Sequence, residues 1–395
     1  QTSIPLAGEY EALLAAAAPE FEFADFDENT RATTFYTTGT TGMPKGVYFS
    51  HRQLVLHTLG NLAAFGTPAT QGRFHQEDVY MPLTPMFHVH AWGMPYVATS
   101  LGVKQVYPGK YAPGTILQLV AGEGVTFSHC VPTVMHMLMN HPSFNELDLS
   151  RWKVLIGGSA LRKSMCQTAM ARGIDIFTGY GMSETCPILT VAHVHRNDLE
   201  FGEEVDLRCT TGRPIPLVEL RLVDEQMNEV AHDGEQVGEI VVRTPWLTQG
   251  YLKDQRNSEN LWRGGYLHTG DVASIDHGNY VTISDRIKDV IKTGGEWLSS
   301  LELEDAISLH PGVAEVAVIG RQDSKWGERP LALVIPREGV EPPTPRQIIR
   351  HLSHFIEKGL LSKQAMLLKM KLVDAIDKTS VGKIDKKNLR IKHLP

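Results

Sequence analysis

The sequence has few cysteines, no long apolar run and little excess charge. Its four cysteines show no CxxC spacing and no paired framework, which is typical of a protein from a reducing cytoplasm. The longest apolar run, 13–18, is far too short to span a bilayer, so no transmembrane segment is expected, whereas peripheral contact with a membrane stays open. The cysteines are Cys130, Cys166, Cys186 and Cys209.

Charge and length narrow the class of protein further. Lys and Arg total 38 against 45 Asp and Glu, and the net charge of −7 argues against nucleic acid as the main partner. At 395 residues, with 42% hydrophobic and 21% charged residues, the chain is long enough for two or three domains with substantial cores.

The most informative stretch is 37–46, TTGTTGMPKG, which is typical of a loop that wraps an anion. Glycine permits close backbone approach, threonine offers hydroxyls and amides, and lysine supplies a positive charge. It is not a Walker A loop, because Pro44 precedes the lysine and Gly46 follows it. The candidate anion-binding residues are Thr37, Thr38, Gly39, Thr40, Thr41, Gly42 and Lys45.

The flanks of this loop predict a strand–loop–strand–helix unit. A strand is expected over 31–36 and a second over 46–49. Ser50 and Gln53 have the spacing of a capping box, which predicts that a helix begins there. One face of that helix is apolar and contains Val55, Leu59 and Leu62.

From 31 to about 200, β-rich runs alternate with helical patterns, which predicts an α/β part with a mainly parallel sheet covered by helices. Ligands of such sheets lie at the carboxyl ends of the strands. The expected strands are 79–83, 103–107, 125–130, 153–156 and 174–178. The expected helices are 115–123, 132–140 and 160–172.

The predicted secondary-structure pattern changes twice after this part. Over 209–284, strands joined by Gly, Asp and Asn turns predict an antiparallel, β-barrel-like subdomain. Over 285–395 a compact α+β pattern follows, with helices at 300–310 and 344–357. We therefore predict a division into 1–208, 209–284 and 285–395.

The segment YTTGTTGMPKGV closely resembles the phosphate-binding signature of the adenylate-forming, AMP-binding superfamily, with Thr38 where that family usually has Ser. Six further blocks follow in the family's order, so the resemblance covers residues 31–390. They are MFHVHAW at 86–92, GGSA at 157–160, YGMSET at 180–185, TGD at 269–271, DRIKD at 285–289 with GGE at 294–296, and KTSVGK at 378–383.

This resemblance implies ATP and coenzyme A as co-substrates and Mg²⁺ as the metal. It assigns the β- and γ-phosphates to the 37–46 loop, and catalysis to Ser183, Glu184 and Lys383, with Glu184 as the Mg²⁺ ligand. The reaction joins two anions, the carboxylate and ATP, so cations and oriented amides must neutralise them. The other implied nucleotide-binding residues are Gly157, Gly158, Ser159, Tyr180, Gly181, Met182, Asp271 and Arg286.

Ordinary structural roles remain open for the same residues. Asp271 in a TGD turn is also typical of a capping aspartate, and Glu184 of a surface cap or ion pair. Lys383 lies in a basic tail whose other cations are typical of a solvated surface or of contacts with coenzyme A phosphates. The tail departs from the family at Asp377, where Pro is common.

The family rotates a mobile C-terminal domain between two half-reactions. The resemblance places the hinge at Lys288 and the access route for coenzyme A at Gly294 and Gly295. It also implies that relatives carry about one further domain before the loop, whereas this chain begins at Gln1.

The pocket block most resembles bacterial medium- and long-chain fatty acyl-CoA synthetases, as do SDRIKDVIKTGGEWLSSLELEDAI and KWGERPLALV. This implies a fatty acid as the small-molecule carboxylate and an acyl pocket lined by His88, Trp92 and Gly181, with Trp92 as a gate. Trp92 as a plain core residue stays open, as do aromatic or short functionalised acids.

Two other classes of function remain as alternatives. The pairs His88/His90 and His193/His195 could each present two metal ligands from one face of a strand, as in a metallohydrolase. The chain could also be an inactive binding remnant. The sequence also leaves open whether the protein forms a homodimer.

Overall fold

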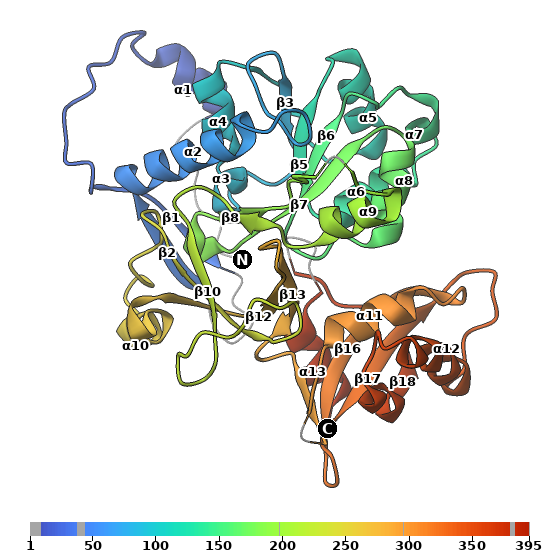
Figure 1. Ribbon diagram of the computed structural model, residues 1–395. Coiled ribbons are helices and arrows are strands. Elements are labelled where there is room, and N and C mark those ends of the chain that lie inside the picture. Colours follow the sequence, from blue (N-terminus) through green and yellow to red (C-terminus); the bar gives the residue numbers. More distant parts are fainter. Residues whose placement is uncertain (1–8, 38–43, 197, 295, 380–383, 395) are drawn as a thin grey trace.

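The computed structural model describes residues 9–37, 44–196, 198–294, 296–379 and 384–394. Over these ranges the chain forms a two-stranded hairpin and three larger sheets (Figure 1). A helix-covered seven-stranded sheet comes first, a four-stranded sheet follows, and a five-stranded sheet with its own helices forms the C-terminal part. This arrangement confirms the predicted combination of α/β and α+β parts.

The seven-stranded sheet has the strand order β4-β3-β5-β6-β7-β8-β9. Its strands are parallel from β4 to β7, while β8 and β9 join antiparallel to this edge. The strand expected over 103–107 is reduced to the two residues of β4. The strands are β3 (Val79–Pro82), β4 (Lys104–Gln105), β5 (Phe127–Cys130), β6 (Lys153–Ile156), β7 (Asp175–Gly181), β8 (Ile188–Val191) and β9 (Arg213–Pro214).

Helices cover both faces of this sheet, and one hydrophobic core lies between the sheet and the helices on each face. In β6, Val154 and Ile156 belong to one core and Leu155 to the other, because successive side chains of a strand point to opposite faces. The helices are α3 (Val89–Trp92), α4 (Met94–Leu101), α5 (Pro113–Gly122), α6 (Pro132–Met139), α7 (Ser143–Glu146), α8 (Lys163–Ala171) and α9 (Phe201–Cys209), with the 3₁₀ turn η1 (Ser183–Thr185) after β7.

The predicted strand–loop–strand–helix unit is confirmed. Strands β1 (Arg31–Thr37) and β2 (Lys45–Ser50) form an antiparallel hairpin, and α2 (His51–Gly66) follows with the Ser50–Gln53 capping box in place.

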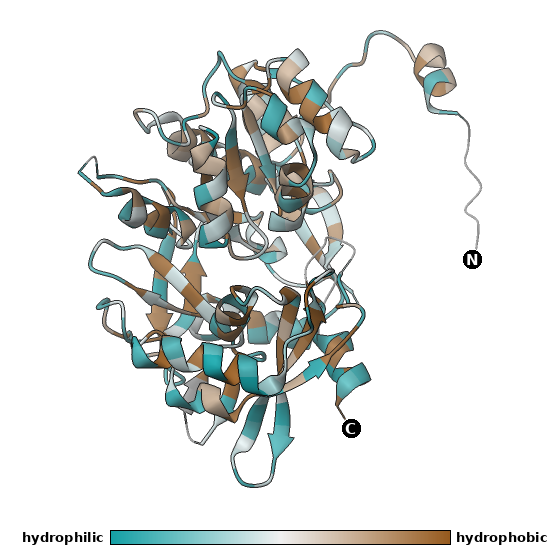
Figure 2. Ribbon diagram, turned by 90° about the vertical axis from the view of Figure 1, so that its right-hand side faces the viewer, coloured by the Kyte–Doolittle hydropathy of each residue, from teal (hydrophilic) through white to brown (hydrophobic). Residues whose placement is uncertain are grey.

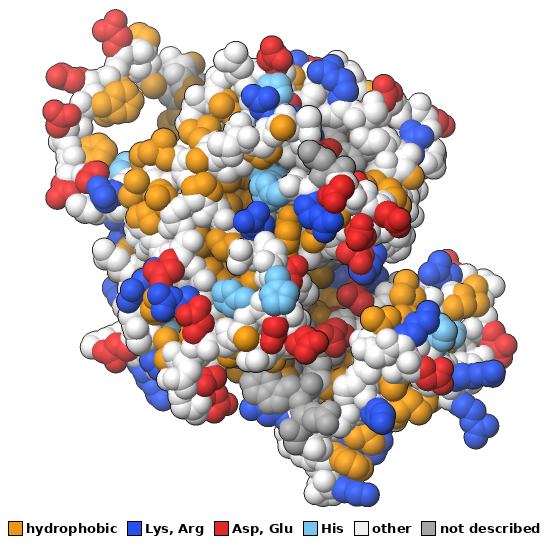
Figure 3. All heavy atoms as spheres, viewed as in Figure 1, with side chains coloured by type: hydrophobic (Ala, Val, Ile, Leu, Met, Phe, Trp, Pro, Cys, Tyr) orange, Lys and Arg blue, Asp and Glu red, His pale blue; other side chains and the backbone are white. Residues whose placement is uncertain are grey.

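The apolar face expected for α2 is only partly buried, because Leu62 packs against the core and the other two residues do not. Val55 and Leu59 are 57% and 52% exposed, whereas His57 and Asn61 on the opposite side are buried. The reason is local hydrogen bonding, because the backbone N–H of Ile188 and the amide of Asn61 both donate to Nε2 of His57 and hold this polar side against β8. Apolar side chains are accordingly visible on the surface over α2 and α4 (Figure 3).

The β-rich part is a four-stranded antiparallel sheet in chain order, β10-β11-β12-β13. In the part of the chain that the structure describes, β10 and β13 form its two edges, so the sheet is open and not closed on itself. Its elements are β10 (Glu219–Val223), β11 (Gly238–Arg243), β12 (Leu267–Ile275), β13 (Val281–Arg286), α10 (Gln255–Leu261) and the 3₁₀ turn η2 (Arg263–Gly265).

The C-terminal sheet has the order β15-β14-β17-β16, with β18 parallel to β17. Its helices pack on an apolar core, and apolar colour accordingly concentrates in the strands (Figure 2). The strands are β14 (Ile291–Thr293), β15 (Glu296–Leu298), β16 (Val313–Asp323), β17 (Gly327–Pro336) and β18 (Lys369–Leu372). The helices are α11 (Ser300–Ser308), α12 (Pro345–Glu357), the 3₁₀ turn η3 (Lys363–Leu367) and α13 (Lys386–His393).

The N-terminal helix α1 (Tyr10–Ala16) stands away from the rest of the molecule and contributes no buried residue (Figure 2). Across the described ranges, no helix combines the length and the apolar character needed to cross a membrane. The division at 208/209 and 284/285 remains a prediction.

Candidate active site

The candidate phosphate loop is the connection of the β1–β2 hairpin. Thr37 ends β1, Lys45 begins β2, and the two residues pair directly across the hairpin. The ladder therefore fixes both ends of the loop. Thr38, Gly39, Thr40, Thr41 and Gly42 lie outside the described residues.

Lys45 and Glu184 meet through a tyrosine that the sequence did not suggest. The ammonium of Lys45 lies 4.5 Å from the ring centroid of Tyr251, whose hydroxyl donates to Oε1 of Glu184 at 2.7 Å. Tyr251 reaches this place because it forms a β-bridge with Val47 of the hairpin. Burial raises the pKa of Glu184, and the charges of Arg286 and Lys45 oppose that rise.

A second tyrosine–carboxylate contact joins two distant predicted residues. The hydroxyl of Tyr180 donates to Oδ2 of Asp271 at 2.7 Å, and the Nε–H of Arg286 donates to Oδ1 at 3.1 Å. Asp271 and Arg286 pair directly across β12 and β13, while Tyr180 comes from β7. The charge of Asp271 raises the pKa of Arg286, and burial followed by the charge of Asp271 raises that of Tyr180.

Arg286 links these two contacts, because it pairs with Asp271 at 3.1 Å and its charge also lowers the pKa of Glu184. Each carboxylate is buried, at 7% and 5% exposure for Glu184 and Asp271, and each is held by a tyrosine hydroxyl. We call this group the tyrosine–carboxylate cluster: Lys45, Tyr180, Glu184, Tyr251, Asp271 and Arg286.

The segment after β7 carries the remaining residues of the YGMSET block. Ser183 opens η1 at the carboxyl end of β7 and is half-buried, as is Met182, whose carbonyl accepts from the hydroxyl of Thr185. Gly181 admits no side chain, because a Cβ there would lie 1.8 Å from the carbonyl oxygen of Pro187. The glycine is therefore required by packing.

The GGSA block follows β6 at the same edge of the sheet. A Cβ on Gly157 would lie 2.9 Å from Cη2 of Trp92, so the indole packs directly on this backbone. Gly158 has φ +81, a left-handed conformation that favours glycine, and both it and Ser159 are exposed. The loop thus presents Gly158 and Ser159 outward and Gly157 toward Trp92.

The pocket block contains a left-handed turn. Val89, His90, Ala91 and Trp92 have φ values of 49, 55, 47 and 59°, which cost energy in residues with a Cβ. His90 ties this turn to β1, since its Nε2 lies 2.9 Å from Oγ1 of Thr33. The turn directs Trp92 inward, where it is 5% exposed, whereas His88 is half-buried.

Neutral, buried histidines flank this turn. His129 hydrogen-bonds to the Tyr80 hydroxyl at 2.7 Å and its ring lies 5.0 Å from that of Trp92, while His57 packs against Gly93. Burial lowers the pKa of both His57 and His129 to about 3, so both are uncharged at neutral pH. We call these four buried side chains, Tyr80, Trp92, His129 and His57, the pocket wall, after the predicted pocket block beside which they pack.

The two HxH pairs do not form a metal site. His90 lies in the left-handed turn and His88 directly before it, so neither is in a strand, and His193 and His195 follow the end of β8. Among the described residues, no group of three His, Cys, Asp or Glu side chains could hold a metal ion. The structure therefore gives the metallohydrolase alternative no support.

The predicted hinge and access residues lie at the start of the C-terminal part. Lys288 is exposed, and its carbonyl accepts a hydrogen bond from the Arg390 guanidinium at 3.3 Å. Gly294 has φ +62, and its N–H donates to the carbonyl of Trp326. Gly295 and Lys383 lie outside the described residues.

Comparison with known proteins shows the family to which this chain belongs. The family model described as AMP-binding enzyme matches residues 5–252, and that described as AMP-binding enzyme C-terminal domain matches residues 302–383. A long-chain-fatty-acid–CoA ligase of Thermus thermophilus is 42% identical over 361 residues, which are 90% of this chain and 64% of that protein.

A second curated relative and a solved structure are also similar to this chain. A 3-methylmercaptopropionyl-CoA ligase of Ruegeria lacuscaerulensis is 39% identical and covers 96% of this chain and 69% of its own length. The crystal structure of ATP-bound MatB from Rhodopseudomonas palustris has a TM-score of 0.82 at 27% identity, with 97% of this chain and 72% of that chain covered. The chain spans about two thirds of the length of the curated relatives it matches.

Proposed function

Because this chain belongs to the AMP-binding enzyme family, we propose that the protein containing it is an AMP-forming acyl-CoA synthetase, an acid–thiol ligase. It adenylates a carboxylic acid with ATP and then transfers the acyl group to coenzyme A. The observation that carries this proposal is the tyrosine–carboxylate cluster, which gathers two buried carboxylates and two cations from separate parts of the fold.

In the first half-reaction a carboxylate oxygen of the acid attacks the α-phosphorus of ATP, and pyrophosphate leaves. Both reactants are anions, so the charge that builds up must be neutralised. Lys45 and the loop before it would bind the β- and γ-phosphates, Ser183 would reach the α-phosphate, and Lys383 would bridge the attacking carboxylate and the α-phosphate.

The nucleoside would lie beside Tyr180 and Asp271. Asp271 would accept from the ribose hydroxyls, and Tyr180 would offer a flat face to adenine, with Gly158 exposed opposite. In the described structure Asp271 already binds Tyr180 and Arg286, one on each oxygen. A carboxylate has about four acceptor positions, so ribose can be added without displacing either partner.

Glu184 fits the role of a Mg²⁺ ligand. Mg²⁺ is typically bound by one or two carboxylates together with substrate phosphates, where it neutralises phosphate charge. Tyr251 binds Oε1 of Glu184, which leaves Oε2 for a hard cation. The same hydrogen bond orients the carboxylate, so Tyr251 is a residue we add to the proposed site.

In the second half-reaction the thiol of coenzyme A attacks the acyl carbonyl, the C–O bond to AMP breaks and AMP leaves. We propose that the residues after Lys288, within the predicted 285–395 domain, rotate about Lys288 between the two steps and that pantetheine enters past Gly294 and Gly295.

We propose a medium- or long-chain fatty acid as the carboxylate. The pocket wall supports this choice, because its histidines are neutral and its largest member is the indole of Trp92, so that it offers an apolar chain no buried charge to desolvate. In this assignment Trp92 gates the acyl tunnel while His88 and Gly181 line it.

A short functionalised acid is the second candidate. It is favoured by the 39% identity to the 3-methylmercaptopropionyl-CoA ligase, whose named acid is short and carries a thioether. An aromatic acid has no such support here. The free cysteines support a cytoplasmic location, which remains a proposal, as do a homodimer and peripheral contact with a membrane.

The two candidate acids are separated by product analysis. The full-length protein that contains this chain is incubated with ATP, Mg²⁺, coenzyme A and single acids from two to sixteen carbons, including 3-methylmercaptopropionate and benzoate. Each buried CH₂ adds about 0.8 kcal/mol, so acyl-CoA formation should rise roughly fourfold in kcat/KM per carbon until the tunnel ends. A maximum at the short thioether acid would favour the second candidate, and a flat or benzoate-preferring profile would exclude a fatty-acid tunnel.

A further inference from the structure

A buried chain of polar contacts crosses the predicted hinge. Asp285 is the second-last residue of β13 and precedes Lys288, whereas Ser300 begins α11 and Lys386 begins α13 after it. All three residues are buried, at 1%, 0% and 8% exposure. The contacts among them therefore join the four-stranded sheet to the C-terminal part in a setting that excludes water.

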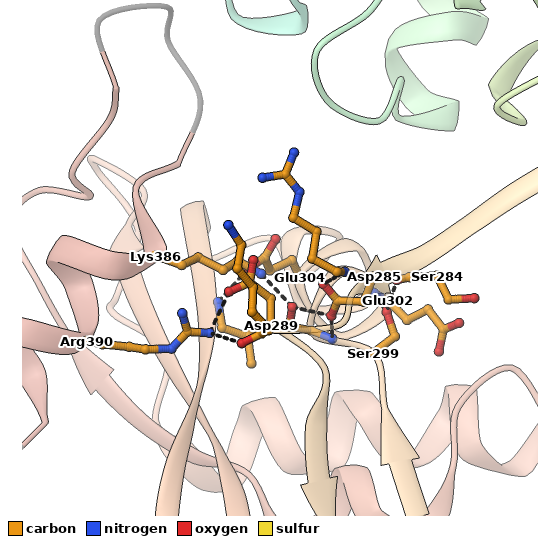
Figure 4. Close-up of polar contacts among 12 residues, drawn as sticks. Ser284, Asp285, Asp289, Ser299, Glu302, Glu304, Lys386 and Arg390 are labelled. Carbon is orange, nitrogen blue, oxygen red and sulfur yellow. Dashed lines mark hydrogen bonds and ion pairs between the residues drawn. The ribbon is translucent and has the colours of Figure 1, made fainter. Parts of the chain in front are cut away.

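The chain is continuous from one side to the other (Figure 4). The backbone N–H and the hydroxyl of Ser300 donate to Oδ2 of Asp285 at 2.6 and 2.5 Å. The ammonium of Lys386 donates to Oγ of Ser300 at 2.6 Å and pairs with Oε1 of Glu304 at 2.8 Å. Ser300 is thus the single hydroxyl through which Lys386 reaches Asp285.

Parallel contacts surround this chain. The hydroxyl of Ser299 donates to the carbonyl of Ser284 at 2.5 Å, which is a second crossing of the hinge. Arg390, one helical turn after Lys386 on α13, binds Asp289 at 2.6 Å (Figure 4). Helix α13 therefore contacts Lys288 and Asp289 directly and reaches Asp285, on the other side of the hinge, through Ser300.

The same helix holds the stem of the segment that contains Lys383. Lys378 and Ile384 form a β-bridge, and the N–H of Asp385 donates to the carbonyl of Asp377. Lys386 follows this stem directly. Through Ser300 it connects the stem to Asp285, the neighbour of Arg286 in sequence, which belongs to the tyrosine–carboxylate cluster.

We propose that Ser300 and Lys386 are positioning residues, which latch the stem of the Lys383 segment to Asp285 for adenylation and must release it before the C-terminal part rotates. This inference rests on the proposed function. The latch favours the first half-reaction, because it ties the described stem, which leads to Lys383 in the sequence, to Asp285 beside Arg286 of the tyrosine–carboxylate cluster.

The first test compares the two half-reactions in the full-length protein. Ser300→Ala removes the hydroxyl and keeps the backbone bond to Asp285, and Lys386→Met removes the ammonium. Each variant should lower acid-dependent ATP–pyrophosphate exchange about tenfold, the effect of losing one hydrogen bond to a charged group. Thioester formation from supplied acyl-adenylate should stay within about twofold of the wild type.

Matched controls come from the same two helices. Ser308→Ala changes a serine at the far end of α11, and Lys387→Met changes the next lysine of α13; both lie outside this chain of contacts and should leave both half-reactions unchanged. An equal fall in both half-reactions for Ser300→Ala, accompanied by a lower Tm, would reduce Ser300 to a structural role and overturn the proposal.

Limited trypsin digestion tests the latch without any activity. Lys288 is exposed, so cleavage after it reports how often the hinge opens. Ser300→Ala and Lys386→Met should each raise the rate of this cleavage about threefold or more, and the controls should not. Unchanged cleavage would overturn the latch, whereas a wild type that activates no acid but shows the predicted cleavage pattern would overturn only the proposed function.

Discussion

The tyrosine–carboxylate cluster and the pocket wall are built on opposite principles. The cluster holds two buried carboxylates with Lys45 and Arg286 around them, and each carboxylate is fixed by a tyrosine hydroxyl. The pocket wall holds histidines whose pKa is lowered by burial to about 3, together with a buried indole. One region concentrates charge and the other removes it.

Under the proposed function, the cluster would suit the charged part of the substrates, and the pocket wall would suit an alkyl chain. A triphosphate and a carboxylate need cations and oriented donors, whereas an alkyl chain gains most from a surface with no charge to desolvate. Trp92 of the pocket wall packs on the backbone of Gly157 in the GGSA block, which lies outside the cluster. Substitutions in the cluster should therefore change the use of ATP, and substitutions in the wall should change the choice of acid.

The largest effect is expected at Lys383. Lys383→Ala should lower adenylation by about 10²–10³, as for the loss of one donor that acts in the transition state, and should largely spare thioester formation from supplied acyl-adenylate. Rapid-quench measurement of the two half-reactions checks this. A comparable loss in both would contradict the assignment of Lys383 to adenylation only.

Asp271 tests the charged side of the comparison. Asp271→Asn keeps the shape but removes the charge that pairs with Arg286, so KM for ATP should rise about 10- to 100-fold while the preferred acid stays the same. Tyr180→Phe is the matched control, since it removes only the hydroxyl bound to Oδ2 and should have a smaller effect. A changed acid preference in Asp271→Asn would break the separation of the two regions.

These residues show what the sequence could and could not predict. The order of the motif blocks indicated Tyr180, Glu184, Asp271 and Arg286, and the structure brings them into one cluster. Tyr251 was missed because no motif marks it. Its place depends on a β-bridge to Val47, some 200 positions away, which no local pattern encodes.

The fold shows the same limit. Alternating strand and helix patterns predicted the parallel sheet, because they depend on local periodicity. The apolar face of α2 is divided in the structure, since Leu62 packs against the core while Val55 and Leu59 are exposed, and the buried His57 accepts a hydrogen bond from Ile188. The left-handed turn at 89–92 was also missed, because no glycine or asparagine within it marks positive φ values.

The pocket wall should make the protein sensitive to acid. The pKa of His129 is about 3 in the folded state against 6.5 for the ordinary value, so the unfolded state binds the proton first as pH falls below 6.5. Stability is therefore fully present above pH 6.5 and is lost toward pH 3. Between pH 7.5 and 5 this histidine should lower the free energy of unfolding by about 2 kcal/mol.

Urea unfolding of His129→Gln at both pH values measures this contribution. The variant should lose about 2 kcal/mol less than the wild type over the same interval, whereas His277→Gln, at an exposed position, should behave as the wild type does. An equal pH dependence in wild type and His129→Gln would show that His129 is not neutral in the folded protein.

The smallest change in kcat/KM is expected from a substitution of Trp92, counted for each CH₂ group of the acid. Trp92→Ala should shift the preferred fatty acid to longer chains, with a change of roughly fourfold in kcat/KM for each CH₂ that the enlarged wall can accommodate. KM for ATP should stay unchanged, because Trp92 touches the Gly157 backbone and not the cluster. An unchanged chain-length profile would make Trp92 a core residue without a gating role.

Acid-dependent ATP–pyrophosphate exchange tests the central claim most directly, since it requires the tyrosine–carboxylate cluster and a bound acid but no coenzyme A. The full-length protein should exchange label from pyrophosphate into ATP only when a carboxylic acid is present, more strongly with straight-chain fatty acids than with acetate. Glu184→Gln should abolish most of that exchange. Exchange without acid, or none with any acid of the panel, would contradict carboxylate adenylation.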